Sequence, residues 1–331
     1  MAFRKVVCTT LLVFLFLIIK ISALNLKDIT FSDKGKQIQT GKVSSLNFKE
    51  VTNLKEPLQI QTTDDSTGII KKNNMVKLYE LPFDSLEKLF KDSSIVSSDI
   101  IERIEYFSER SLGTPYVLSS LGEGSFGQYD KDPIVDLSRV DCMTFCEQIL
   151  ALSISYNYDE FIYTLQKIRY HSETVSIKNR NHFFIADWLP SNNWLIEDVT
   201  RDVGGELCRQ MTKTVNRYQL LLSFGCKDSI NVLKEQTLTQ LFIPKEYLFE
   251  ISSNLKNGDI VCIISKKRGI FASHLGFIIK TKDSGLFFRN ASKFVRKVID
   301  EPYHRLAYRL MRQKYAAGIS VFRTKVNLTL E

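Results

Sequence analysis

Two cysteines stand four residues apart in the segment VDCMTFCEQ, residues 140 to 148. A thiol can attack a carbonyl, join a disulfide, bind a metal or fill the core. Residues four apart on a helix have Cβ atoms about 5 to 6 Å apart, and a disulfide needs about 3.5 to 4.5 Å. Cys142 and Cys146 are therefore not expected to bridge. A zinc site would need further close ligands, but the remaining cysteines after residue 24 are scattered singly: Cys208, Cys226 and Cys262.

Position separates the two thiols. Cys142 follows Asp141, a residue type that caps helices, and so stands in the first turn of a predicted helix. Unpaired N–H groups and the helix dipole favour an anion there, and we expect them to lower the thiol pKa. Cys146 lies one turn further in, where core packing is the natural interpretation. Cys142 is the candidate nucleophile, with packing as the alternative.

A nucleophilic thiol needs a base and a group that orients the base. The chain has four histidines. His274 opens the predicted strand SHLGFIIK, whereas His171 and His182 lie in a mixed segment and His304 follows Pro302. A single histidine is often structural, so His274 is a candidate base only. Asn290, in RNAS on the next predicted strand, can orient it, unless that amide faces a turn or is a glycosylation acceptor.

The elements that must position these residues change along the chain. Apolar residues at helical spacing predict helices in the first half, in DSLEKLF, SSDIIERIEYFSERSLG, DCMTFCEQILALSIS and YDEFIYTLQKIRY. Short β-branched and aromatic runs predict strands in the last third, in GDIVCIIS, SHLGFIIKT, GLFFRNAS, KFVRKVID and GISVFRTK. Helices followed by an antiparallel-looking sheet predict an α+β fold.

Residues 1–23 combine basic residues, an apolar run and a small-residue end, which is typical of a cleaved export signal. The alternative, a membrane anchor, is disfavoured because Lys20 cuts the run well short of about 20 apolar residues. Residues 24–83 form a polar lead-in that we expect to be poorly structured. Residues 84–331 are the predicted catalytic domain, with an insertion at about 171–250.

Charge and cysteine count restrict the partners. The net charge of +8 falls to +5 when the signal's Arg4, Lys5 and Lys20 are removed. This balance suits an anionic polymer such as cell-wall material, and no nucleic-acid-reading motif is present. Five cysteines remain after cleavage. An odd number in an exported protein leaves at least one thiol unpaired within the chain or paired with another molecule.

Several motifs together carry a resemblance to a known family. LGTPY, then DC opening a helix, GD opening a strand, and SHLGF resemble the NlpC-type papain-like cysteine hydrolases of bacterial cell walls. Further segments look like the N-acetylmuramoyl-L-alanine amidase-like family within that superfamily: LSRVDCMTFCEQILAL, LQKIRY, NHFFIADWL, EDVTRDVGGEL, LKNGDIVCII and FRNASKFVRKV. The resemblance covers about residues 84–325. It implies a papain-like α+β fold, a helical first half packed on an antiparallel sheet or partial barrel.

The resemblance implies roles for the candidate residues. Cys142 is the nucleophile, His274 the base, and Tyr116 contributes to the oxyanion environment. The chain departs from the family pattern at Asn290, where the pattern has histidine; an asparagine can fix the imidazole tautomer but supplies no charge. A nearby carboxylate such as Asp259 is the alternative orienter.

Five further residues are expected to line the substrate groove: His182, Asp187, Trp188, Asp198 and Thr200. For the segment NHFFIADW the equal alternative is that Trp188 and its aromatic neighbour belong to the core and that Asp187 is a helix cap.

The implied function is cleavage of the N-acetylmuramoyl-L-alanine amide bond through a thioester. Two alternatives remain: an endopeptidase cutting the stem peptide between D-glutamate and the diamino acid, or an inactive peptidoglycan-binding protein. The expected partners are peptidoglycan fragments (muropeptides), without nucleic acid and without a stable membrane anchor after signal cleavage. We expect no cofactor, no metal, a monomer, and a periplasmic or secreted location.

Overall fold

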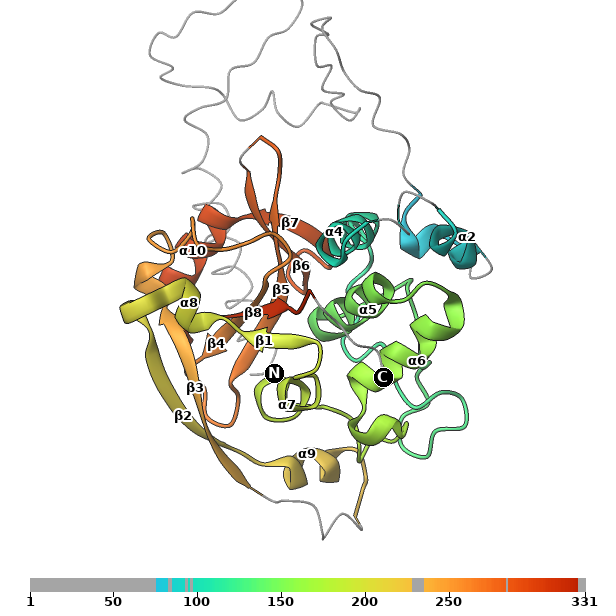
Figure 1. Ribbon diagram of the computed structural model, residues 1–331. Coiled ribbons are helices and arrows are strands. Elements are labelled where there is room, and N and C mark those ends of the chain that lie inside the picture. The colour runs from blue at the N-terminus through green and yellow to red at the C-terminus, as the bar shows by residue number, and fades with distance from the viewer. Residues whose placement is uncertain are drawn as a thin grey trace, which may run out of the picture. The chain divides into compact units, whose positions relative to one another are not determined.

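Three helices form one side of the described chain. They are α4 (Ile100–Arg110), α5 (Cys142–Ile154) and α6 (Tyr158–Arg169), and α5 packs against both others (Figure 1). Each begins at a side-chain cap supplied by Asp99, Asp141 or Asn157, which satisfies otherwise unpaired N–H groups. All residues of α5 from Thr144 onward are buried. The helix that carries Cys142 is thus the central one.

The computed structural model describes residues 76–82, 85–92, 95, 98–227, 235–283 and 285–326. They belong to one unit, residues 71–331. The predicted signal, 1–23, and nearly all of the lead-in, 24–83, lie outside the described residues, so both stay predictions. No helix within the described ranges has the length and apolar character needed to cross a membrane.

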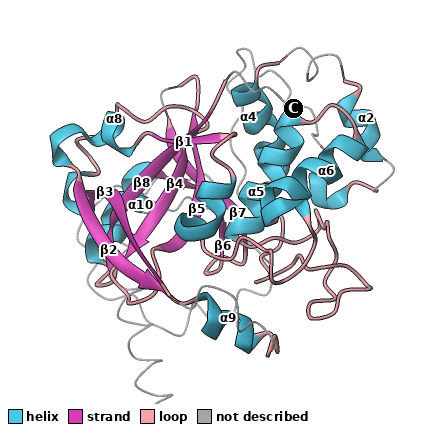
Figure 2. Ribbon diagram, turned by 60° about the horizontal axis from the view of Figure 1, so that its bottom comes forward, coloured by secondary structure: helices cyan, strands magenta, loops and turns pink. Residues whose placement is uncertain are grey.

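The sheet is antiparallel, in the order β2-β3-β8-β4-β5-β6-β7, with β1 also paired to β8. Its strands are β1 (Ile196–Asp198), β2 (Arg209–Val215), β3 (Gln236–Pro244), β4 (Ile260–Ser265), β5 (Ala272–Lys280), β6 (Leu286–Ser292), β7 (Lys297–Pro302) and β8 (Ala316–Thr324). Figure 2 shows the sheet and the three helices as neighbouring parts. The predicted α+β class with an antiparallel sheet is confirmed.

Apolar cores lie on both faces of the sheet. One joins α5 to the sheet, with Phe145 against Phe277 at 5.7 Å between ring centroids. The other lies under α10 (Tyr303–Arg312) and includes Leu306 and Leu310. Every residue of β4 is buried, as expected for a strand covered on both faces. This double cover holds β4 and β5 in place beside the start of α5.

Shorter helices complete the described chain: α2 (Leu86–Phe90), α7 (Leu189–Ser191), α8 (Thr200–Gly204), α9 (Arg217–Ser223), the π-helix η5 (Phe184–Trp188), and the 3-10 helices η2 (Leu78–Glu80), η4 (His171–Glu173), η6 (Gly205–Leu207) and η8 (Lys245–Tyr247).

Three features differ from the sequence-based expectation. Residues 171–250, predicted as a mixed insertion, contribute β1, β2 and β3 to the same sheet. The predicted strand at 293–300 begins only at Lys297, because Arg296 takes a left-handed turn with φ of 65°. Helix α10 was not predicted. The helix has only ten residues, and its four buried residues give too short an apolar pattern to predict it from the sequence.

Candidate active site

Cys142 is the first residue of α5, and Asp141 fixes the position of that helix start. The Asp141 carboxylate accepts hydrogen bonds from the N–H groups of Met143 (3.0 Å), Thr144 (2.8 Å) and Ser119 (2.9 Å). The Thr144 hydroxyl in turn accepts from the Asp141 N–H at 2.8 Å. This reciprocal capping box locks both the helix and the preceding loop.

The thiol is not anionic at rest. Burial, and after it the negative charge of Asp141, raise the pKa of Cys142 to about 12, against the opposing N–H groups of Leu275, Cys142 and Met143. The expectation of a lowered pKa is wrong, first because the thiol is desolvated and second because Asp141, as N-cap, accepts bonds from two first-turn N–H groups and brings a negative charge beside the sulfur. The first-turn N–H groups of Met143 and Thr144 are thus already bound by the Asp141 cap.

His274 is held by Asn290. The His274 Nε2 atom lies 2.8 Å from Asn290 Oδ1, and Asn290 Nδ2 donates to the Phe288 carbonyl at 3.0 Å. Because that carbonyl needs a donor, Oδ1 faces the imidazole and Nε2 carries the hydrogen. Nδ1 of the neutral ring is then left as a proton acceptor. Burial lowers the pKa of His274, which favours this neutral form.

A glycine makes room for that pair. Gly276 follows His274 on the same face of β5, and a Cβ there would lie 2.9 Å from Asn290 Cβ and 2.5 Å from the Arg289 carbonyl oxygen. Any side chain would therefore push β6 away and disturb the His274 to Asn290 contact. The glycine is visible in the sequence segment SHLGF, but the need for it comes from the neighbouring strand β6, which the segment does not show.

Cys142 and His274 line the same two pockets. The first, the charged pocket, has a volume of about 640 Å³ and is bounded by Tyr116, Asn290, Glu301 and Arg305 among others. The second, the apolar pocket, has about 250 Å³ and includes Phe183, Phe184, Ile185 and Phe271. Within the described ranges no hydrogen bond joins the Cys142 thiol to the His274 ring. The two side chains share one surface, with a pocket to either side.

Tyr116 also faces the charged pocket. Burial raises its pKa to about 12, and the nearby Cys142 and Asp141 act in the same direction. Its hydroxyl therefore stays protonated at neutral pH and can donate a hydrogen bond. The structure brings together four residues named from the sequence: Tyr116, Cys142, His274 and Asn290.

Comparison with known proteins places the chain in a family. A family model described as N-acetylmuramoyl-L-alanine amidase-like (AmiA-like) matches residues 106–316, which include all four of these residues. The chain belongs to this amidase-like family. No curated protein matches the sequence.

Two crystal structures show the same fold. Protein LPG0564 from Legionella pneumophila shares 24% identity, with a TM-score of 0.66 over 73% of this chain and 93% of its own. An N-acetylmuramoyl-L-alanine amidase from Bacteroides uniformis shares 24% identity, with a TM-score of 0.54 over 69% of this chain and 98% of its own. At this identity the likeness shows the fold alone.

In this amidase-like chain one of the five predicted groove residues, His182, lines a pocket beside Cys142, and Asp187 lies in a polar pocket next to it. His182 lines both the apolar pocket and this polar pocket of about 430 Å³, which also includes Asp187, Arg180 and Arg217. The His182 Nε2 atom lies 2.7 Å from the Ile177 carbonyl, and burial lowers the pKa of His182 to about 4. The ring is neutral and donates to that carbonyl. Asp187 lines only the polar pocket, where it pairs with Arg217.

The other three predicted groove residues are structural. Trp188 is 1% exposed and stacks on Phe184, so it belongs to the core. Thr200 is fully buried and joins α8 to β8, because its hydroxyl accepts from the Val321 N–H at 2.9 Å. Asp198 accepts from the Thr200 N–H at 2.9 Å. Trp188, Asp198 and Thr200 line neither pocket beside Cys142, so the structure does not bring them to the site and their groove role stays a prediction.

Asp259 is not the orienter of His274. Its carboxylate is fully buried and binds the Arg323 guanidinium through two contacts of 2.7 and 2.9 Å. It also accepts from the Lys256 N–H at 2.7 Å. These bonds fix the turn before β4, and His274 has Asn290 as its partner instead.

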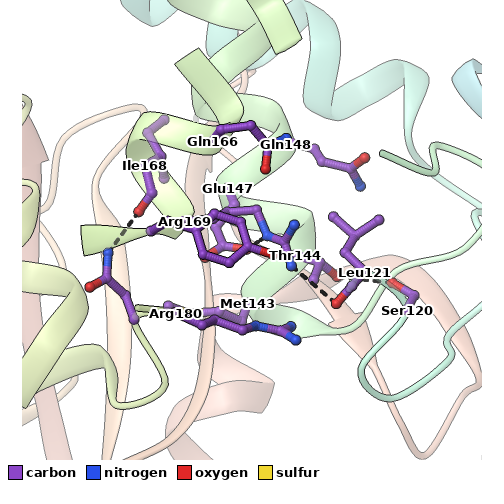
Figure 3. A network of polar contacts seen from close by, with 12 residues as sticks. Ser120, Leu121, Met143, Thr144, Glu147, Gln148, Gln166, Ile168, Arg169 and Arg180 are labelled. Carbon is purple, nitrogen blue, oxygen red and sulfur yellow. Dashed lines mark hydrogen bonds and ion pairs between the residues drawn. The ribbon is translucent and has the colours of Figure 1, made fainter. Parts of the chain in front are cut away.

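A buried ion pair supports the helix start from behind. Arg169 of α6 lies 3.3 Å from Glu147 of α5, with side-chain exposures of 0% and 5%. Figure 3 shows Arg169 between Glu147 and Leu121. Arg169 Nη2 donates a hydrogen bond to the Leu121 carbonyl at 3.0 Å. Ser120 and Thr144 oxygens lie 3.4 Å apart in the same network. No local pattern in the sequence predicts this pairing, because the two residues meet only when α5 and α6 pack.

All five described cysteines are free thiols. Cys146 is 2% exposed and packs in the core between α5 and the sheet, as its position one turn inside the helix predicted. Within the described ranges no group of three His, Cys, Asp or Glu side chains is placed to hold a metal ion.

Proposed function

We propose that the protein is an exported cysteine hydrolase that cleaves the amide bond between N-acetylmuramic acid and L-alanine in cell-wall fragments. Membership of the amidase-like family supports the bond type and a peptidoglycan substrate. The observation that carries the cysteine mechanism is that Cys142 shares its pockets with His274, whose ring is held by Asn290. The papain-like, NlpC-type assignment, the monomeric state and the periplasmic or secreted location belong to the same proposal.

The reaction begins from a neutral pair. The Cys142 pKa is raised and the His274 pKa is lowered, so thiol and imidazole are both uncharged at neutral pH. His274 Nδ1 takes the thiol proton as the sulfur attacks the amide carbonyl carbon. Negative charge moves to the carbonyl oxygen, where the Cys142 N–H and the Tyr116 hydroxyl donate to it.

Collapse of this intermediate breaks the carbon–nitrogen bond. The imidazolium gives its proton to the departing L-alanine nitrogen, which leaves as an amine. The lactyl carbonyl remains on Cys142 as a thioester. His274 then takes a proton from water, the resulting hydroxide attacks the thioester, and the sulfur leaves and regains its proton. Water is consumed, and an acid and an amine are formed.

Purified protein incubated with muropeptides tests the proposal by mass spectrometry of the products. We expect a free lactyl-sugar and an intact peptide from the wild type, and no turnover by Cys142→Ala. Cys208→Ala is the matched control, because Cys208 is also a free thiol and lines neither pocket beside Cys142. A shortened peptide with the sugar still attached would indicate the endopeptidase instead. Binding of muropeptides with identical products from wild type and Cys142→Ala would indicate a binding protein.

Export is tested separately. N-terminal sequencing of the protein recovered from the exported fraction should begin at Leu24, directly after the predicted signal. Recovery of full-length chain in the cytoplasm alone would contradict the proposal.

A further inference from the structure

We propose that the charged pocket binds the peptide side of the substrate and that Arg305 and Lys293 bind its carboxylates. This inference rests on the proposed amide cleavage, because it assigns the two sides of the scissile bond to two pockets. The leaving peptide contains D-glutamate and a diamino acid, so it brings several carboxylates and an amine, whereas the acyl side is a sugar with a short lactyl arm.

The two pockets beside Cys142 and His274 differ in chemistry. Phe183, Phe184 and Phe271 border the apolar pocket. The charged pocket is more than twice as large, and Lys293, Arg305 and Arg309 reach it together with Asp300 and Glu301. A ligand with several ionised groups loses much of its hydration on entering an apolar pocket, which is costly. The charged side of the substrate therefore belongs in the charged pocket.

Ion pairing inside that pocket leaves positive charge open. Arg309 binds Glu301 through two contacts of 2.8 and 2.7 Å, and Asp300 is bound by Arg289 at 2.7 and 2.8 Å. Among the described residues Arg305 has no hydrogen-bonding or ion-pair partner, and Lys293 has only the Phe294 ring, 5.3 Å from its Nζ atom. Both carboxylates of the pocket are thus already neutralised, and the two open groups are cations.

The polar pocket is the competing site for a carboxylate. It also contains arginines, but Arg180 lies 3.1 Å from Asp130, and Arg217 is paired with Asp187. Both guanidinium charges are compensated within the chain. Lys178 also borders the polar pocket, 5.8 Å from the Tyr129 ring. The polar pocket includes neither Cys142 nor His274 and joins the apolar pocket through His182, so it is the less direct site for the carboxylates of the peptide.

Helix α10 presents Arg305 in a fixed place. Arg305, Arg309 and Gln313 follow one another at intervals of four residues and all border the charged pocket, as expected for one side of a helix. Leu306, Ala307 and Leu310, on the neighbouring side of the helix, are buried in the core. The backbone under Arg305 is thus anchored, while its side chain is exposed to the pocket.

Calorimetric binding of a product peptide to the Cys142→Ala protein tests this assignment without any turnover. The probes are the free tripeptide L-alanyl-γ-D-glutamyl-diaminopimelate and the same tripeptide with its carboxylates amidated. In the Cys142→Ala background we expect Arg305→Gln to weaken binding of the ionised tripeptide about tenfold, since hydrogen bonds to charged groups are the stronger ones. Lys293→Gln should act in the same direction. Binding of the amidated tripeptide should change little.

Arg312→Gln is the matched control, because Arg312 lies on α10 and does not border the pocket. Equal affinity of Arg305→Gln and Arg312→Gln, no binding of the tripeptide, or loss of binding on Arg180→Gln instead would each overturn the assignment. Expected binding combined with no cleavage of muropeptides by the wild type would leave the subsite standing and reject the proposed activity. Cleavage of muropeptides by the wild type, together with unchanged tripeptide binding in Arg305→Gln, would support the proposed activity and reject the subsite.

Discussion

His274 Nε2 lies 2.8 Å from Asn290 Oδ1, and the same amide donates to the Phe288 carbonyl at 3.0 Å. The second bond fixes which amide atom faces the ring, and the first then fixes which ring nitrogen carries the hydrogen. The base is oriented by a neutral group. Its pKa is consequently governed mainly by burial, which lowers it, against smaller raising effects of the Asn290 hydrogen bond and the Glu301 charge.

Replacing Asn290 by aspartate should change the pH profile of the reaction. A carboxylate in contact with the imidazole favours its charged form and raises the pKa of His274. Since the mechanism needs the neutral ring, the acid limb of kcat/KM should move to higher pH. Asn290→Ala should lower kcat about tenfold or more, because the tautomer is no longer held. An acid limb in the same place for Asn290→Asp and wild type would contradict this account.

The wild-type pH profile should have an acid limb without an alkaline limb near neutrality. Activity rises as His274 loses its proton, at a pKa below the ordinary value, and the Cys142 thiol does not ionise until about pH 12. Activity should therefore be flat from about pH 7 to pH 9. Alkylation of Cys142 by iodoacetamide should be slow at pH 7 and rise up to the highest pH at which the protein stays folded. Fast alkylation at pH 6 would indicate a thiolate–imidazolium pair instead.

Removing the charge of Asp141 should make Cys142 more reactive. Asp141 is the second cause of the raised thiol pKa, after burial, and asparagine keeps an oxygen for the helix cap. We expect Asp141→Asn to be alkylated several-fold faster at pH 8. Asp99→Asn is the matched control, because Asp99 forms the same capping box on α4. An equal gain in both variants would mean that helix fraying, not charge, sets the reactivity.

Gly276→Ala should damage the site through packing. The new Cβ would meet the Arg289 carbonyl oxygen at 2.5 Å and Asn290 Cβ at 2.9 Å. Such overpacking costs about 1 to 3 kcal/mol of unfolding free energy. Turnover should fall further than stability alone explains, because the contact between His274 and Asn290 is disturbed. Denaturant unfolding and kcat measured side by side test this, and full activity with native stability would refute it.

The ion pair between Glu147 and Arg169 should matter for stability. Arg169→Met leaves a buried carboxylate without its cation, which costs about 3 to 5 kcal/mol. Lys91→Met, which removes an exposed pair with Glu87, should cost less than about 1 kcal/mol. Denaturant unfolding at pH 7 compares the two, and similar losses would contradict the role of the buried pair.

The same pair should make stability depend on pH. Burial raises the pKa of Glu147 in the folded protein, against the effect of Arg169. The carboxyl group therefore contributes most stability below its unfolded pKa and loses that contribution as pH rises through the folded pKa. The glutamine in Glu147→Gln does not titrate. The stability of this variant relative to the wild type should therefore increase between about pH 4 and pH 7. A constant difference across that range would refute the prediction.

The helices and most strands could be read from the sequence because their signals are local. Asp99, Asp141 and Asn157 cap helices whose apolar spacing is also visible in the sequence. Long-range pairing could not be read in this way. Asp259 was a reasonable partner for His274 until the fold placed it on Arg323, 64 residues further along the chain. For Trp188 the sequence leaves groove and core as equal alternatives, because its burial depends on packing against Phe184 and the sheet, which local sequence does not show.

The sequence by itself determined which cysteine begins a helix, which histidine lies near the start of a strand, and that an asparagine follows on the next strand. These depend on neighbours a few residues away. Only the tertiary structure decided that the thiol is neutral, that Asn290 is the partner of His274, and that Arg305 and Lys293 are the open cations beside the site. The physical reason is that burial, ion pairing and the shape of a pocket are set by segments that are distant in the chain.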